Sequence, residues 1–221
     1  MIEKNILFGI PLLRSKIDPK LYNKKEIIKT IEKNYSIDPN RNKWYTSPNK
    51  SKLHHSFNDW NNKKFKNPNF KKIIPVYAKT IMDCLKTLSI KKKFDARIAI
   101  RNYTCLKSSQ YMEKHHHISN DVDFTAVHYV KFNKEKHLPT TFHNSQNFSN
   151  YFSLLNPKYI NFLDHTYTDN SFMSDEYYLN TKEDDFFIIP SILEHSIPIQ
   201  NSDETRITIV LNINIELTKD K

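Results

Sequence analysis

The chain has 221 residues, a formal net charge of +10 at pH 7 and a single glycine, Gly9. One glycine excludes P-loop and dinucleotide-binding folds, because their phosphate loops need several glycines for close backbone approach. The charge would suit nucleic acid, acidic proteins or anionic surfaces as partners, but the lysines are dispersed, and the densest runs lie in the N-terminal half. No Pro- or Ser-rich linker divides the chain, so we expect one domain over residues 1–221.

The cysteines and the hydropathy pattern bear on location. Only Cys84 and Cys105 are present, so no disulfide framework is expected. No apolar run approaches the ~20 residues of a membrane span, and no secretory signal pattern opens the chain. We therefore expect no membrane partner and a reducing, cytoplasmic location. The sequence leaves the oligomeric state open.

The N-terminal half predicts a strand and two helices. Apolar residues 6–13 predict the strand, and helices are expected over residues 19–35 and 70–88, the second from its regular 3.6-residue repeat. A long helix ahead of a run of strands usually packs on the outer face of a sheet. His54 and His55 are adjacent, so their side chains point apart, and we expect structural or surface roles instead of a shared metal.

Strands dominate the C-terminal half. The expected strands cover residues 96–103, 125–132, 176–180, 186–189 and 206 onward, with a strand and a loop over 138–152 and weak patterning over 153–173. The last strand alternates strictly, with Ile207 and Ile209 on one face and Arg206 and Thr208 on the other. One face is apolar and the other largely polar. This pattern predicts a barrel or sandwich whose mouth holds a charged ligand.

Three histidines form a candidate metal site. In an extended segment, His115 and His117 project to the same side, so both imidazoles can reach one metal, while His116 points away. His195, near the end of a later apolar segment, is available as a third ligand. Three protein ligands on one side of a first-row metal leave positions open for a cosubstrate and O2.

Several segments together resemble the Fe(II)- and 2-oxoglutarate-dependent oxygenases, and among these the oxygenases common in bacteriophage and marine bacterial genomes. The most specific is IIPSILEHSIPIQNSDETRITIVLNI at residues 188–213, which is similar to the family's pattern of a turn, a distal histidine and an R-x-S/T strand ending in asparagine. Weaker matches are LFGIPLL near the start, WYTSPN at residues 44–49 and TAVHYV at residues 125–130.

The resemblance implies a fold and an activity. The implied fold is mainly β, a double-stranded β-helix or jelly roll over residues 94–217, with an N-terminal strand and a helical buttress over residues 1–93. The implied activity is that of a hydroxylase that couples the decarboxylation of 2-oxoglutarate to oxidation of a substrate C–H bond. A protein side chain, a nucleobase and a small metabolite all remain open as substrates.

The resemblance also implies roles for single residues. His115 and His117 would be the proximal Fe(II) ligands and His195 the distal one. Arg206 would form the salt bridge to the C5 carboxylate of 2-oxoglutarate, with Thr208 and Tyr129 donating hydrogen bonds to it. A planar guanidinium beside hydroxyl donors is well suited to a carboxylate.

One departure from the family pattern leaves the third metal ligand open. Most of these oxygenases use H-x-D or H-x-E, whereas His117 stands at the carboxylate position here. Asp121 or Asp123 could supply the carboxylate if the loop folds back. Two further functions stay open beside the oxygenase. One is a three-histidine, cupin-type dioxygenase or metal-binding protein that does not use 2-oxoglutarate, and the second is a basic nucleic-acid-binding module.

Overall fold

The computed structural model describes residues 2–7, 10–41, 51–57, 59–90, 93–119, 121–144 and 176–218. The segments 44–49 and 153–173, noted in the sequence, lie outside the described residues. The helical elements are η1 (Pro19–Leu21), α1 (Lys24–Ile37) and α2 (Ile73–Lys86). The strands are β1 (Glu3–Leu7), β2 (Ile10–Lys16), β3 (His54–His55), β4 (Phe94–Leu106), β5 (Met112–His115), β6 (Phe124–Lys131), β7 (Thr141–His143), β8 (Glu176–Tyr178), β9 (Asp185–Pro190), β10 (His195–Ile197) and β11 (Arg206–Leu217).

The described strands form two antiparallel sheets. The larger has the order β1-β2-β9-β6-β11-β4-β3 and the smaller the order β5-β10-β7-β8. From β4 to β11 the chain passes repeatedly between the two sheets, and each of these strands pairs with neighbours distant in sequence. This is the jelly-roll topology. The predicted double-stranded β-helix is confirmed.

The N-terminal strand differs from the prediction. A single strand was expected over residues 6–13, but Leu7 pairs with Ile10 and Glu3 with Arg14, so this region is a hairpin. Because β2 then pairs with β9, the hairpin adds two strands to one edge of the larger sheet. The apolar run is therefore divided between two strands by a reversal of the chain.

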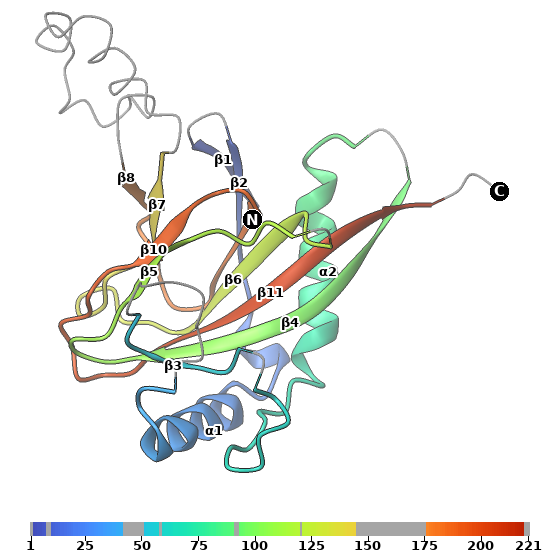
Figure 1. Cartoon of the computed structure of the whole chain (residues 1–221). Coiled ribbons are helices and arrows are strands. Elements are labelled where there is room, and N and C mark those ends of the chain that lie inside the picture. The colour runs from blue at the N-terminus through green and yellow to red at the C-terminus, as the bar shows by residue number, and fades with distance from the viewer. Residues whose placement is uncertain are drawn as a thin grey trace, which may run out of the picture.

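Both α-helices pack on the outer face of the larger sheet, as predicted (Figure 1). Their buried residues recur at helical spacing, with Ile27 and Ile31 on α1 and Ile73, Tyr77 and Ile81 on α2, all fully buried. Burying each such side chain contributes about 1.5–3 kcal/mol, so this layer is a main source of stability. In the described part of the chain, no helix is long and apolar enough to span a membrane.

The two faces of β11 have the predicted difference. Ile207, Ile209 and Leu211 enter the core between the sheet and the helices. On the opposite face, Thr208 and Val210 line a pocket between the two sheets. The larger sheet thus has helices behind it and the pocket in front of it.

Both cysteines are free and buried, which agrees with the expected lack of a disulfide framework, and the cytoplasmic location stays a prediction.

Candidate active site

Strand pairing brings the first two histidines together. In the smaller sheet His195, the first residue of β10, stands directly opposite His115, the last residue of β5. Residues opposite each other in antiparallel strands have neighbouring side chains on one face. The two ring centroids are accordingly 4.4 Å apart. His195 is also opposite Phe142 of β7, so it occupies the centre of this sheet and is only 5% exposed.

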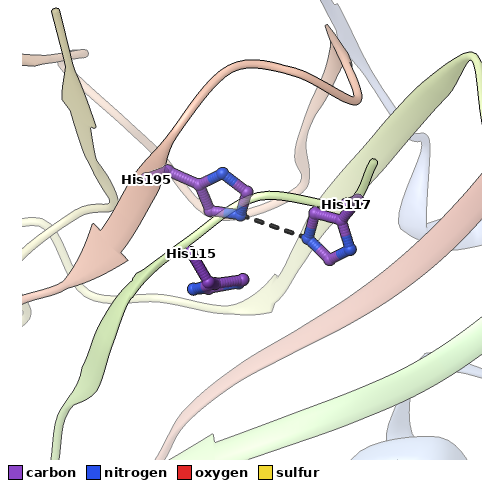
Figure 2. Close-up of side chains that lie close together, drawn as sticks. All are labelled: His115, His117 and His195. Atoms are coloured by element: carbon purple, nitrogen blue, oxygen red, sulfur yellow. Dashed lines mark hydrogen bonds between the residues drawn. The ribbon is translucent and has the colours of Figure 1, made fainter. Parts of the chain in front are cut away.

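His117 completes the cluster from the segment after β5. Its backbone N–H donates to the carbonyl of Ser191, in the turn that follows β9, at 2.9 Å. This contact holds the imidazole beside His195, with their Nε2 atoms 3.3 Å apart (Figure 2). One ligand atom from each of the three histidines can be chosen so that all lie within 4.8 Å of one another. The geometry therefore suits a single metal ion.

Hydrogen bonds fix the tautomers of two of these rings. His115 Nδ1 lies 2.8 Å from the carbonyl oxygen of Glu113, and His195 Nδ1 lies 2.9 Å from that of Leu193. A carbonyl only accepts, so Nδ1 donates in both rings and Nε2 carries the lone pair. The same arrangement of a backbone carbonyl behind the ring is common for metal-binding histidines.

Burial keeps the three imidazoles neutral. It lowers the pKa of His117 to about 3 and that of His195 well below the usual value, and in both cases the neighbouring histidines add to the effect. The pKa of His115 is also lowered, chiefly by burial. At neutral pH all three rings can therefore offer lone pairs, which is the form that binds a metal.

The neighbouring candidates lie elsewhere. His116 is exposed and accepts a hydrogen bond from the N–H of Ile118. Asp121 is exposed, and the carboxylate of Asp123 accepts from the N–H of Ile215 at 2.7 Å. In the described part of the chain, the three histidines form the group that could hold a metal ion, and neither aspartate belongs to it.

Arg206 is a buried cation without a carboxylate partner among the described residues. It opens β11 and is 0% exposed. Its Nε donates to the carbonyl of Leu138 at 3.2 Å, and its guanidinium lies over the Tyr129 ring at 5.1 Å. Nη1 is buried and has no hydrogen-bond partner in the described structure. Burial lowers the pKa of Arg206, but an arginine stays charged in a protein. The site therefore has a positively charged group with an unused hydrogen-bond donor.

Thr140 connects this cation to the histidine pocket. Its Oγ1 accepts hydrogen bonds from Tyr129 Oη at 2.6 Å and from Arg206 Nη2 at 3.3 Å. A hydroxyl accepts two hydrogen bonds and donates one, so the hydroxyl hydrogen of Thr140 remains to be donated. Thr140 lines the same pocket as the three histidines. Sequence reasoning missed this residue, because the strand and loop expected over residues 138–152 did not indicate which side chains face a pocket.

Thr208 also lines this pocket, but its hydroxyl is engaged. The Oγ1 atoms of Thr208 and Thr104, on adjacent strands, are 2.7 Å apart, and either can be the donor. Only one of the two hydrogens is used in that contact. The pair can therefore still donate one hydrogen bond to a ligand.

Of the structural or surface roles expected for His54 and His55, burial excludes the surface role for both. His54 is structural, with Nδ1 2.6 Å from the carbonyl of Asp38 and Nε2 3.2 Å from Tyr103 Oη. His55 faces the other way and lines the pocket of the three histidines, and burial lowers its pKa to about 3. The expectation that adjacent side chains point apart holds, and it means that one of the pair faces the pocket.

The site thus joins a cluster of three histidines to a buried guanidinium in the interior of a jelly roll. Such a site can hold a first-row metal and a small carboxylic acid together. The unpaired Nη1 of Arg206 favours an anionic ligand, because a buried cationic donor is costly unless an anion pairs with it.

The family follows from the sequence itself. Residues 103–212, which contain all three histidines, Arg206 and Thr140, match the family model described as "Putative 2OG-Fe(II) oxygenase". The chain belongs to this family and is a 2-oxoglutarate-dependent oxygenase, which uses Fe(II), 2-oxoglutarate and O2. No curated protein matches the chain.

Three similar solved structures have low sequence identity to this chain. A prolyl-4-hydroxylase from Pseudomonas putida is 6% identical, with 92% of each chain covered and a TM-score of 0.46. A prolyl hydroxylase from Trichoplax adhaerens, in complex with a hypoxia inducible factor peptide fragment, is 11% identical, with 91% of this chain and 83% of that chain covered and a TM-score of 0.48. AviO1 from Streptomyces viridochromogenes is 10% identical, with 92% and 89% covered and a TM-score of 0.48.

Proposed function

We propose that this oxygenase is a hydroxylase in which His115, His117 and His195 hold Fe(II) and Arg206 binds the distal carboxylate of 2-oxoglutarate. The observation that carries the proposal is the buried guanidinium. Within the described structure it has no carboxylate partner, and its Nη1 has no hydrogen-bond partner. Its hydrogen bond to Thr140 connects it to the pocket of the three histidines. In this proposal, a dicarboxylate binds the metal with one end and the cation with the other.

Charge compensation selects the ligand of Arg206. A guanidinium at 0% exposure has lost its hydration, and the surrounding groups are a carbonyl, a hydroxyl and two aromatic rings. None of these carries a negative charge. A carboxylate that pairs with Nη1 would restore the lost interaction with a charge-assisted hydrogen bond, which is about twice as strong as a neutral one.

The hydroxyls would orient that carboxylate. Tyr129 and Arg206 both donate to Thr140, which leaves the Thr140 hydrogen as the donor toward the pocket. Tyr129 therefore acts indirectly, by fixing the orientation of the Thr140 hydroxyl group. This differs from the role implied by the resemblance, in which Tyr129 itself donates to the ligand. The hydroxyls of Thr208 and Thr104 are hydrogen-bonded to each other, so only one of their two hydrogens is free for the ligand. Thr208 donates to the ligand only when Thr104 is the donor within the pair.

The protein's part in the reaction is to bind, orient and exclude water. Iron, when bound with 2-oxoglutarate, supplies the activation of O2 that the family uses. The three imidazoles occupy one side of the site, and the apolar residues Val127, Val210 and Ile197 line the pocket beside them. These side chains limit the access of water to the reacting region.

The test is turnover with the residues changed one at a time. With Fe(II), O2 and 2-oxoglutarate at the half-saturating concentration of the wild type, the wild-type protein should form succinate. His195→Ala should abolish this activity, and Arg206→Ala should reduce it at least about tenfold. The exposed His116 provides the matched control, because His116→Ala should keep wild-type succinate formation. Succinate formation at the wild-type rate in Arg206→Ala would contradict the proposed carboxylate site.

The three-histidine cupin-type alternative makes the opposite prediction. A dioxygenase of that kind would bind Fe(II) through the same histidines but consume O2 without forming succinate. The buried Arg206 would then need another anion, and the described residues offer none near it. The match of residues 103–212 to an oxygenase family disfavours the other alternative, a basic nucleic-acid-binding module.

A further inference from the structure

The arginines of this chain fall into two groups. There are five, and three are ion-paired with a carboxylate. These pairs are Arg14 with Asp185 at 2.8 Å, Arg41 with Asp59 at 2.8 Å and Arg97 with Glu216 at 2.7 Å. Within the described part of the chain, Arg101 and Arg206 have no carboxylate partner. Both lie beside the histidine pocket, so the second unpaired cation needs an explanation of its own.

A β-bulge places Arg101 outside the regular alternation of β4. On β4, Asn102 is opposite Val210 of β11 and Ile100 is opposite Leu211, so Arg101 is an additional residue in the register. Bulges bend a strand and redirect a side chain, and they are frequent next to active sites. The bulge lets Ile100 face the helices while Asn102 faces the pocket, and it frees Arg101 from the alternation.

Arg101 is held against the pocket wall. Its guanidinium carbon lies 4.2 Å from the centroid of the Phe57 ring, and Phe57 lines the pocket together with the three histidines. The charge of Arg101 is close enough to contribute to the lowered pKa of His117. Stacking on an aromatic ring restricts the guanidinium plane, so its fork of donors is oriented before any ligand arrives.

Asn102, the next residue, supplies a second unused polar group. It is 2% exposed and lines the pocket, and its Oδ1 has no hydrogen-bond partner in the described structure. A buried amide oxygen without a partner is unfavourable, so a ligand that donates to it would gain affinity. The unused cation and the unused acceptor are adjacent in sequence. Asn102 lines the pocket itself, and Arg101 lies over the ring of Phe57, which also lines it.

We propose that Arg101 and Asn102 form the substrate-binding wall of this site. The substrate that the enzyme oxidises then carries a carboxylate or a phosphate next to an N–H or O–H donor. The anionic group pairs with Arg101 and the donor with Asn102. This inference rests on the proposed function, since Arg206 is taken by 2-oxoglutarate and Arg101 is left for the substrate. A neutral nucleobase or an uncharged side chain would not use this cation.

The experiment measures anion binding in the protein that already holds metal and cosubstrate. The wild-type protein is loaded with Mn(II), a paramagnetic substitute for Fe(II), and saturated with 2-oxoglutarate. Propionate and methyl phosphate are then titrated separately, and the relaxation of their 1H and 31P nuclei reports binding near the metal. At least one probe should bind saturably, and the better probe identifies the anionic group.

The variants separate this role from those of the metal and 2-oxoglutarate ligands. Arg101→Gln should weaken the better probe about 10- to 100-fold, as expected for loss of a hydrogen bond to a charged group, and Arg101→Lys should restore part of the affinity. Arg97→Gln is the matched control on the same strand, exposed and already ion-paired, and should bind the probe like wild type. Affinity for 2-oxoglutarate should be unchanged in Arg101→Gln.

Two results would overturn the inference alone. In the first, the protein binds 2-oxoglutarate but neither probe binds saturably. In the second, a probe binds but Arg101→Gln leaves its affinity unchanged, as expected for an anion bound only to the metal. If the wild-type protein failed to bind Mn(II) and 2-oxoglutarate at all, the proposed function would fail first.

Discussion

His117 and His195 face each other through their Nε2 atoms at 3.3 Å, although they are 78 residues apart in sequence. Because Nδ1 of His195 donates to Leu193, its Nε2 can only accept, so a hydrogen bond between the rings requires the proton to be on His117. Two imidazole nitrogens that share one cation, each about 2.1 Å from it, lie roughly 3.0–3.4 Å apart. The separation therefore also fits two ligands of one metal.

The first prediction concerns His195. His195→Ala should abolish metal binding, because His195 is the member opposite His115 and beside His117. The fold should persist, since β10 is short and the main core lies behind the larger sheet. Calorimetry with Mn(II) measures the binding and circular dichroism checks the fold. A folded variant with wild-type affinity would remove His195 from the site.

A second prediction compares the three consecutive histidines. His115→Ala and His117→Ala should each weaken metal binding by about an order of magnitude or more, as losses at a metal site usually do. His116→Ala should have little effect, because this side chain is exposed outside the cluster. Asp123→Ala is a further control for a carboxylate ligand. A metal affinity that falls with His115→Ala and Asp123→Ala but not with His117→Ala would assign the third ligand to that aspartate.

The third prediction separates the two ligands of the site. Arg206→Ala should lose 2-oxoglutarate affinity by about 30-fold to several thousand-fold, the equivalent of about 2–5 kcal/mol for a buried charge pair, while keeping metal affinity. Arg206→Lys should recover part of the loss, because an ammonium keeps the charge without the planar fork. Equilibrium dialysis with labelled 2-oxoglutarate measures both. Equal loss of metal and 2-oxoglutarate would indicate a folding defect.

The fourth prediction ranks the hydroxyls. Thr140→Val should weaken 2-oxoglutarate binding by about 0.5–3 kcal/mol, because it removes the proposed donor and leaves two buried donors, from Tyr129 and Arg206, without their acceptor. Thr208→Val should cost less, since its hydroxyl shares one hydrogen bond with Thr104. The same dialysis assay tests the order. A larger effect from Thr208→Val would reverse these assignments.

The fifth prediction concerns acid stability. Burial lowers the pKa of His128, behind the larger sheet, to about 3, whereas in the unfolded chain it is near 6.5. Between these values the unfolded chain binds more protons, so stability is present above about pH 6.5 and falls with acid by about 1.4 kcal/mol per pH unit for this group. His128→Gln should reduce that slope in urea unfolding between about pH 6.5 and 4.5. An unchanged slope would contradict the assigned pKa.

The fold was predictable where local patterns are strong. The alternation after Arg206 and the helical period of α2 both identify an element and its buried face from sequence alone. The N-terminal hairpin was not predictable, because residues 6–13 are apolar on both sides of the reversal. The sequence also contains no sign of the extra residue at Arg101, since the bulge depends on pairing with the distant β11.

The site was predictable where its residues belong to a motif. His115, His117, His195 and Arg206 all stand in recognisable segments, and the structure brings the three histidines together. Thr140 and Asn102 reach the pocket through strand pairing and loop closure, so no local pattern reveals them. His55 could have been anticipated, because one of two adjacent residues on a strand must face inward when its neighbour points to the opposite side.

The most direct measurement of the central claim is an anaerobic titration of the Fe(II)-loaded protein with 2-oxoglutarate, followed by visible absorption. Chelation of the metal by 2-oxoglutarate should produce a weak charge-transfer band that saturates in wild type and in His116→Ala. The band should be absent in His195→Ala, and Arg206→Ala should require a much higher 2-oxoglutarate concentration to form it. Wild-type protein that binds Fe(II) but shows no band at any 2-oxoglutarate concentration would contradict the assignment of Arg206 and the three histidines to one site.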